Sequence, residues 1–218
     1  MNILAFDTSG AACSAAVLRR GEVVAHRFVA MERGHAEALL PMIRDVMAEA
    51  GLDWSGLSRI AVTTGPGAFT GIRIGLAAAR GLALASSLPL YGVSTFEAVA
   101  SACGIEGAGP LLVALESRRE AVFVQLFRPD GESPPASVMP EELAGFVPPG
   151  PFRLCGDGAE RAAASLRFGG RNDFIMAGAA PPDAAEVGRV ALRAGLPEPG
   201  GPRPLYLRAP DVSFPAAI

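Results

Sequence analysis

The order of apolar segments in the first hundred residues is the feature that most restricts the fold. Three segments with strand character, at residues 3–6, 13–18 and 23–28, are separated by short turns that contain glycine. A segment with helical spacing follows at residues 35–50. Short apolar strands at 60–63 and 90–93 then alternate with helices expected at 71–86 and 95–103. The predicted order is βββαβαβα, which places this half of the chain in the α/β class.

The second half of the chain repeats this order more loosely. A hairpin is predicted around residues 117–119, a short strand at 153–155, and helices at 157–167 and 183–194. Residues 1–128 contain four prolines and residues 129–218 contain fifteen, so we expect shorter elements joined by stiff turns there. Two related halves of about 100 residues each predict a duplicated architecture with a cleft between the halves.

The types of residue that are missing exclude several classes of enzyme. All 19 basic residues are arginine, which removes the lysine that a Walker A loop, a pyridoxal enzyme or a protein kinase requires. The two histidines, His26 and His35, have no metal-ligand spacing, and no GxSxG nucleophile motif occurs. The three cysteines, Cys13, Cys103 and Cys155, are far apart in sequence and are expected to be small hydrophobic residues.

Charge and hydropathy favour a protein of the cytoplasm that does not bind nucleic acid strongly by itself. The net charge of −3 has the wrong sign for an autonomous nucleic-acid binder, so any RNA contact is expected to need a partner. The longest stretch without a charge, residues 81–96, is shorter than the ~20 residues of a membrane span and contains Pro89. Residues 1–7 lack a basic region and a cleavage site, and we therefore expect neither a secretory leader nor a membrane association.

Two motifs have residues suited to binding phosphate. Residues 7–10 (Asp-Thr-Ser-Gly) form a turn that could offer N–H groups to phosphate and a carboxylate to hydrated Mg²⁺, or could be an Asx-turn that stabilises a hairpin. Residues 64–75 (TGPGAFTGIRIG) lead several glycines into a helix, which suits an anion at the helix N-terminus. The same glycines would also allow close packing of a strand against a helix, and both interpretations stay open.

Small and apolar residues on the helices at 35–50 and 71–86 point to a binding surface for another protein. The second helix has two stripes of small residues at a spacing of four: Gly71, Gly75 and Ala79 on one, and Ala77, Gly81 and Ala85 on the other. The first helix has apolar residues around much of its circumference: Leu39, Leu40, Met42, Ile43, Val46 and Met47. We expect a second protein to cover these helices.

Several segments closely resemble the bacterial TsaB (YeaZ) family. In the first hundred residues they are ILAFDTSGAACSAAVL (3–18), RGHAEALLPMI (33–43), TTGPGAFTGIRIGLAAARGLA (63–83) and YGVSTFEAVA (91–100). The TGPGxFTGxRxG string is specific to the family. The resemblance is less sharp in the second half, where it covers ESRREAVF (116–123), Gly-Asp-Gly (156–158) and PLYLR (204–208).

The resemblance implies an actin-like, Hsp70-like ATPase (ASKHA) fold with two duplicated RNase-H-like domains and mixed sheets. It implies an N-terminal domain at residues 1–103 and a smaller, proline-rich C-terminal domain at 104–218. The family's partner-binding helices correspond to residues 35–50 and 71–86.

The function that the resemblance implies is that of a non-catalytic subunit. Family members belong to the complex that adds a threonylcarbamoyl group to N6 of the adenosine 3′ of the anticodon in tRNA. They act as scaffold and dimerisation subunits for TsaD, the catalytic paralogue, and the ATPase TsaE completes the complex. The resemblance therefore implies a heterodimer with TsaD, a homodimer through the same helices, and an indirect relation to tRNA.

The resemblance also suggests which residues perform these roles. The expected partner interface is His35, Leu39, Ile43, Met47, Ile72, Gly75, Leu76, Ala79 and Ala83, and we expect a charge at Leu76 or Ala79 to abolish pairing. A vestigial phosphate site is expected at Asp7, Thr8, Gly65, Gly67 and Thr70. In the paralogue two histidines hold a metal. Their counterparts here are Thr95 and Val99, so no metal site is expected, and Glu116 stands where the family usually has an aspartate.

An alternative function is a small ATPase or kinase of the same fold that acts through Asp7 and the loop at residues 65–71. Against it stand the short second half and the lack of a second acid-glycine phosphate turn near Glu116. We expect no cofactor to bind the isolated chain, and a nucleotide only at the junction between subunits.

Overall fold

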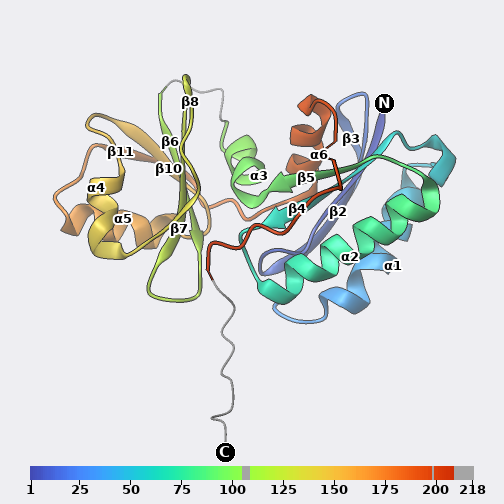
Figure 1. The fold of residues 1–218 in the computed structure, drawn as a ribbon, viewed down its shortest axis with the longest axis horizontal. Helices are drawn as coiled ribbons and strands as arrows, with labels where there is room; N and C mark the ends of the chain where they lie inside the picture. Colours follow the sequence, from blue (N-terminus) through green and yellow to red (C-terminus); the bar gives the residue numbers. More distant parts are fainter. Residues whose placement is uncertain (105–108, 198, 209–218) are drawn as a thin grey trace, which may run out of the picture.

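The computed structural model describes residues 1–104, 109–197 and 199–208, and it has two lobes, each built on one β-sheet (Figure 1). The first sheet has the strand order β3-β2-β1-β4-β5. Its strands are β1 (Asn2–Asp7), β2 (Ala12–Arg19), β3 (Glu22–Ala30), β4 (Arg59–Gly65) and β5 (Leu90–Ser94). The pairs β1–β2 and β2–β3 are antiparallel, whereas β4 is parallel to β1 and to β5.

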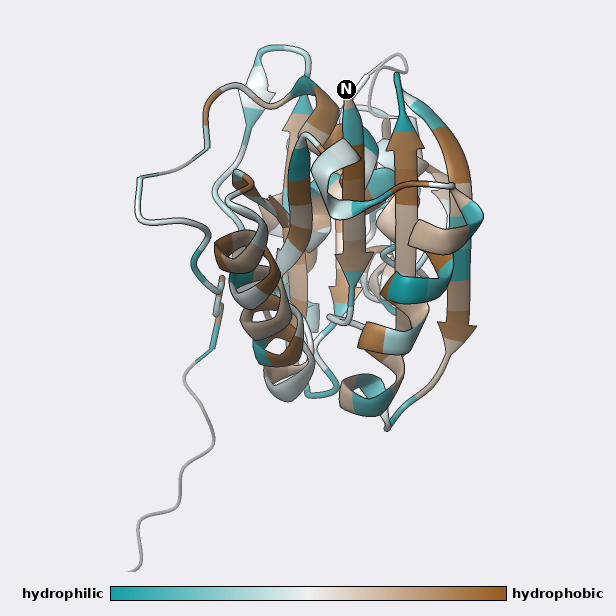
Figure 2. Cartoon of the chain, turned by 90° about the vertical axis from the view of Figure 1, so that its right-hand side faces the viewer, coloured by the Kyte–Doolittle hydropathy of each residue, from teal (hydrophilic) through white to brown (hydrophobic). Residues whose placement is uncertain are grey.

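The helices of the first half are α1 (His35–Glu49), α2 (Phe69–Ser86) and α3 (Thr95–Ala102), with a 3₁₀ turn at Trp54–Gly56. Helices α1 and α2 pack on one face of the first sheet, because their apolar residues share a cluster with Leu4, Phe6 and Val17 of the strands. Figure 2 shows hydrophobic residues along the central strands of this sheet. The predicted order βββαβαβα is confirmed, although α2 begins two residues before the predicted start.

The second sheet repeats the pairing pattern of the first. Its strands are β6 (Leu111–Glu116), β7 (Val122–Arg128), β8 (Gly131–Glu132), β9 (Ala136–Val138), β10 (Phe152–Cys155) and β11 (Phe174–Gly178). Their order is β11-β10-β6-β7-β8, and β9 also pairs with β7. The strands β6 and β7 form an antiparallel hairpin, and β10 is parallel to β6 and to β11. Each lobe is thus an antiparallel ribbon extended by two parallel strands, which confirms the predicted duplication.

The helices of the second half are α4 (Leu143–Phe146), α5 (Ala159–Phe168) and α6 (Ala184–Arg193), preceded by a 3₁₀ turn at Pro140–Glu142. The last helix, α6, lies on the first sheet, where Ala184, Val187 and Ala191 join a cluster with Ile3 and Leu18. Its amphipathic spacing buries one stripe against β1 and β2.

Helix α3 follows the strands of the first sheet in sequence but packs against the second lobe. Phe96, Val99 and Ala100 of α3 join a buried cluster with Leu111 and Val113 of β6, in the second lobe. Helices α3 and α6 also contact each other between the two sheets, as their positions in Figure 1 suggest. The predicted division into domains at residue 103 stays a prediction. The structure adds that α6, beyond that point in the sequence, packs on the first sheet.

The chain after α6 returns along the first lobe. The N–H of Leu205 donates to the carbonyl of Thr64 (2.8 Å), and Arg80 of α2 donates to the carbonyl of Pro202 (2.8 Å). This segment thereby joins the end of β4 to the outer side of α2. None of the helices in the described ranges has the length and apolar content needed to cross a bilayer.

Candidate functional site

The turn after β1 is organised around the buried carboxylate of Asp7. One oxygen, Oδ1, accepts hydrogen bonds from the N–H of Ser9 (3.1 Å), the hydroxyl of Ser9 (2.6 Å) and the hydroxyl of Thr63. The bond from the N–H two residues on defines an Asx-turn, so that interpretation of residues 7–10 is confirmed. The other oxygen, Oδ2, is buried without a hydrogen-bond partner in the described part of the chain. Burial raises the pKa of Asp7 above its ordinary value.

The glycine-rich loop packs directly on this turn. The N–H of Ala68 donates to the carbonyl of Ser9 (2.7 Å), and the hydroxyl of Thr8 donates to the carbonyl of Gly71 (2.7 Å). A side-chain carbon at Gly67 would overlap the carbonyl oxygen of Ser9, and one at Gly71 would overlap the carbonyl oxygen of Thr8. The close-packing interpretation of these glycines is therefore confirmed, since backbone fills the space between turn and loop.

The structure brings only part of the predicted phosphate site together. Asp7 and Thr8 are buried under the loop, whereas Thr70 is exposed on the first turn of α2. Gly65 lies at φ +104° against the carbonyl of Leu205, and its peptide bond to Pro66 is cis. A phosphate role for these residues stays a prediction, and their hydrogen bonds are made within the chain.

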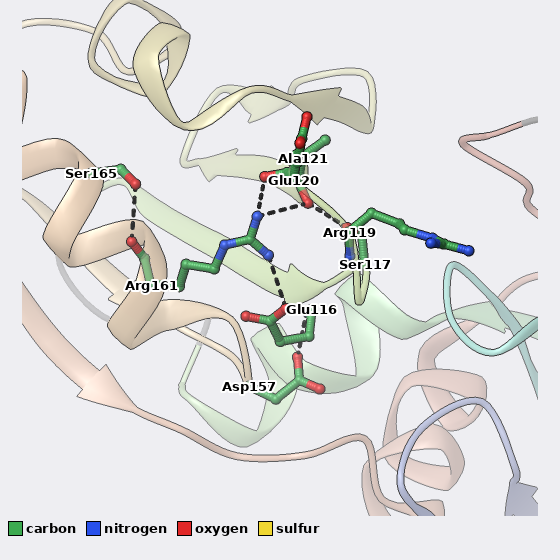
Figure 3. A network of polar contacts seen from close by, with 8 residues as sticks. All are labelled: Glu116, Ser117, Arg119, Glu120, Ala121, Asp157, Arg161 and Ser165. Carbon is green, nitrogen blue, oxygen red and sulfur yellow. Dashed lines mark hydrogen bonds and ion pairs between the residues drawn. The ribbon is translucent and has the colours of Figure 1, made fainter.

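In the second lobe, Figure 3 shows an ion pair at the end of β6, the strand that has the place of β1 in the second sheet. Glu116, at the end of β6, pairs with Arg161 of α5 (3.1 Å), and Arg161 also donates to the carbonyl of Glu120. Asp157 accepts a hydrogen bond from the N–H of Glu116 (3.0 Å). Although Asp157 as a whole is exposed, partial withdrawal of its carboxyl from water raises its pKa. Both acids thus already have partners within the second lobe.

The cavity between the two turns is small. It has a volume of about 80 Å³ and is lined by residues of both lobes, among them Ser9, Gly67, Thr95, Glu116 and Asp157. Pockets that bury a small-molecule ligand usually measure ~300–1,000 Å³. Within the described residues, no group of three or more His, Cys, Asp or Glu side chains is placed to hold a metal ion.

The residues predicted to form the partner interface lie in the core of this chain. All of them are buried except Ala83, which is partly buried: His35, Leu39, Ile43, Met47, Ile72, Gly75, Leu76, Ala79 and Ala83. They pack α1 and α2 against the first sheet and against each other. The chain's own sheet covers these side chains, and their role as a partner interface stays a prediction.

The outward face of α2 has the second stripe of small residues. Ala77, Gly81 and Ala85 are exposed there, and Leu84 beside them is 84% exposed. On α1, Leu40 is 53% exposed, while the other apolar residues that suggested a second covering protein are buried. The two stripes of α2 thus face in different directions, and one of them faces solvent.

Sequence reasoning missed a groove between the lobes, lined by arginines and aromatic rings from α2, the β6–β7 hairpin and residues 205–208. These segments are distant in sequence. The signal available was the ArgArg pair at the predicted hairpin tip, together with the PLYLR segment.

Two sheets of the same topology, with helices crossed between the lobes, define a protein of the actin-like ATPase (ASKHA) fold class. Residues 24–180 match the family model described as "TsaD: tRNA N6-adenosine threonylcarbamoyltransferase". The chain belongs to the TsaB (YeaZ) family, as the sequence motifs indicated.

Individual relatives agree with this assignment. The chain is 38% identical over 148 residues to the tRNA threonylcarbamoyladenosine biosynthesis protein TsaB of Escherichia coli K12, an alignment that covers 65% of this chain and 64% of that protein. It is similar to a Pseudomonas aeruginosa structure described as an uncharacterized protein with similarity to peptidase YEAZ. That match has 29% identity and a TM-score of 0.80, over 95% of this chain and 99% of the other.

A more distant structure shows the fold alone. Component A of the (R)-2-hydroxyglutaryl-CoA dehydratase of Acidaminococcus fermentans has 11% identity and a TM-score of 0.51, over 87% of this chain and 97% of that chain.

Proposed function

We propose that this protein is a non-catalytic scaffold subunit that binds and stabilises the catalytic paralogue TsaD, in the complex that adds a threonylcarbamoyl group to tRNA adenosine. The observation that carries the proposal is the closed turn at Asp7. Backbone of the loop at residues 67–71 fills the space over this turn, and the cavity beside it measures about 80 Å³. The cavity at this turn is by itself smaller than ligand pockets usually are, which favours a role in binding rather than in phosphate chemistry at Asp7.

The residues at the start of α3 also support a non-catalytic role. Thr95 is buried and its hydroxyl donates to the hydroxyl of Ser9 (3.3 Å), while Val99 lies in the core beside the second sheet. Ser94 and Glu97 close a capping box at the start of this helix. The two positions that correspond to the paralogue's metal-binding histidines, Thr95 and Val99, are therefore engaged in contacts within this chain.

The proposed partner surface is the outward face of α1 and α2. It combines the large exposed side chains Leu40 and Leu84 with small residues that would let a second pair of helices approach closely. Binding here would favour the TsaD conformation that is complementary to this face. By thermodynamic linkage, the favoured conformation of TsaD must in return bind this protein more tightly than the other conformations of TsaD do.

Light scattering after gel filtration tests this proposal. The protein alone, TsaD from the same organism alone, and an equimolar mixture would be measured at the same concentrations. The proposal predicts a discrete heterodimer in the mixture, formed at the expense of any homodimer. Elution of the two proteins as separate species at concentrations of tens of micromolar would contradict it. A dissociation constant of about 10 µM corresponds to a binding free energy of only ~7 kcal/mol, so even a weak complex would be seen at these concentrations.

A further inference from the structure

A groove of about 650 Å³ lies between the start of α2, the tip of the β6–β7 hairpin and residues 205–208. Among the described residues, its lining contains four arginines and no aspartate or glutamate, although the whole chain has a net charge of −3. Two exposed aromatic rings lie among these arginines. The residues that define the groove are Arg73, Arg118, Arg119, Arg208, Phe69 and Tyr206.

One wall of the groove is a preassembled stack. The guanidinium carbon of Arg73 lies 3.7 Å from the centroid of the Phe69 ring, and its Nε donates to the Tyr206 hydroxyl (3.1 Å). The Phe69 and Tyr206 ring centroids are 5.2 Å apart. The two residues are 38% and 37% exposed, so two aromatic rings and a cation lie together at the surface.

The opposite wall is the tip of the β6–β7 hairpin. Arg118 is exposed at φ +58°, a left-handed conformation, and the Ser117 hydroxyl accepts a hydrogen bond from the N–H of Arg119 (3.2 Å). Figure 3 shows the Arg119 side chain extending away from the ion pair of Glu116 and Arg161. Within the described residues, no carboxylate forms an ion pair with Arg73 or Arg118.

We propose that this groove binds a single-stranded segment of nucleic acid, with phosphates at the hairpin arginines and a base stacked on the Phe69–Tyr206 wall. Single strands are bound in this way, by a cationic groove that follows the backbone and by rings that stack on the bases. The groove volume is in the range of occupied ligand pockets. A free nucleotide has the same phosphate and base chemistry but makes fewer contacts. The proposal does not rest on the scaffold function.

Fluorescence anisotropy of a labelled single-stranded oligoribonucleotide of roughly ten nucleotides tests this at low salt. The variants are Arg118→Glu and Arg20→Glu. Arg20 is a matched control, because it is exposed at φ +55° in the β2–β3 turn, at the end of the first sheet opposite Asp7. We expect Arg118→Glu to weaken binding about tenfold or more and to reduce the salt dependence, whereas Arg20→Glu changes it by less than about twofold.

A second pair of variants tests the stacking wall. We expect Tyr206→Ala to weaken binding about fivefold or more, and Tyr206→Phe to stay near wild type because the ring remains. Arg119→Glu replaces Arg118→Glu if thermal unfolding shows that the latter does not fold. Absence of saturable binding, or equal losses for Arg118→Glu and Arg20→Glu, would overturn the proposal. Equal competition by adenosine monophosphate and by unlabelled oligonucleotide would also overturn it, and would assign the groove to a free nucleotide.

Discussion

Thr8 and Gly71 hold the first strand of the molecule against its second helix without intervening space. The hydroxyl of Thr8 donates to the carbonyl of Gly71 at 2.7 Å, and a side chain at Gly71 would overlap the carbonyl oxygen of Thr8. A helix N-terminus that binds a phosphate must leave its backbone N–H groups accessible to the anion. Here the same glycines bring helix and turn into contact, and the motif serves packing.

Gly71→Ala is expected to destabilise the protein by about 2–3 kcal/mol, because the added methyl group meets backbone that cannot rotate away. The matched control is Gly81→Ala in the same helix, where an added Cβ has no neighbour within 4 Å. That change is expected to stabilise by about 0.5–1 kcal/mol through helix propensity. Urea denaturation of the three proteins measures both effects. Stabilisation by both substitutions would contradict the packing described here.

The raised pKa of Asp7 predicts a characteristic pH dependence. In the unfolded chain Asp7 loses its proton near pH 3.8, whereas in the folded protein it keeps the proton to a higher pH. The free energy of unfolding therefore falls as the pH rises from about 3.8 to the higher pKa of the folded protein. Asn cannot ionise, and Asp7→Asn is expected to gain stability relative to wild type as the pH rises from 4 to neutrality. Denaturation curves at a series of pH values measure this difference. A difference independent of pH would contradict burial of the carboxylate.

Asp183 is predicted to hold α6 on the first lobe. Its Oδ1 accepts the N–H of Ala185 (2.8 Å) as a helix cap and lies 2.8 Å from Nε2 of His26 in β3. Asp183→Ala is expected to cost about 1–2 kcal/mol, whereas Asp183→Asn should lose less because asparagine also caps helices. Thermal unfolding distinguishes the two variants. Equal losses would show that the contact with His26, rather than the cap, dominates.

The isolated protein is expected to show no Mg²⁺-dependent hydrolysis of ATP above the rate in buffer. Its acids are already engaged, since Asp7 is buried and Glu116 pairs with Arg161. Phosphate release would be measured with Asp7→Asn as control, so that a contaminating ATPase is recognised by its persistence in the variant. Hydrolysis that is lost in Asp7→Asn would restore the kinase or ATPase alternative.

The strand order and most helices could be predicted from the sequence, because turns and apolar periodicity mark them clearly in the first half. The elements that were missed, β8, β9, β11 and α4, have two to five residues each, which is too short for periodicity to be visible. The packing of α3 on the second lobe and of α6 on the first could not be predicted from the sequence either. It depends on contacts between segments far apart in sequence, such as those of α6 with β1 and β2.

The outward face of α2 was the part of the candidate site that could not be predicted from the sequence. Small or apolar residues occupy nearly its whole circumference, so the spacing identified two stripes but could not show which one faces the sheet. A charge at Leu76, which is 3% exposed, is now expected to unfold the protein rather than to prevent pairing selectively. Leu84 on the opposite side becomes the informative position.

The most direct test of the account is the dissociation constant for TsaD of wild type, Leu84→Glu and Leu196→Glu, measured by isothermal titration calorimetry. Leu196, which is 95% exposed beyond the end of α6, is the control for adding a charge at an exposed leucine. We predict that Leu84→Glu weakens binding about tenfold or more while Leu196→Glu leaves it unchanged. Equal affinities for all three folded proteins would show that the outward face of α2 does not bind the partner.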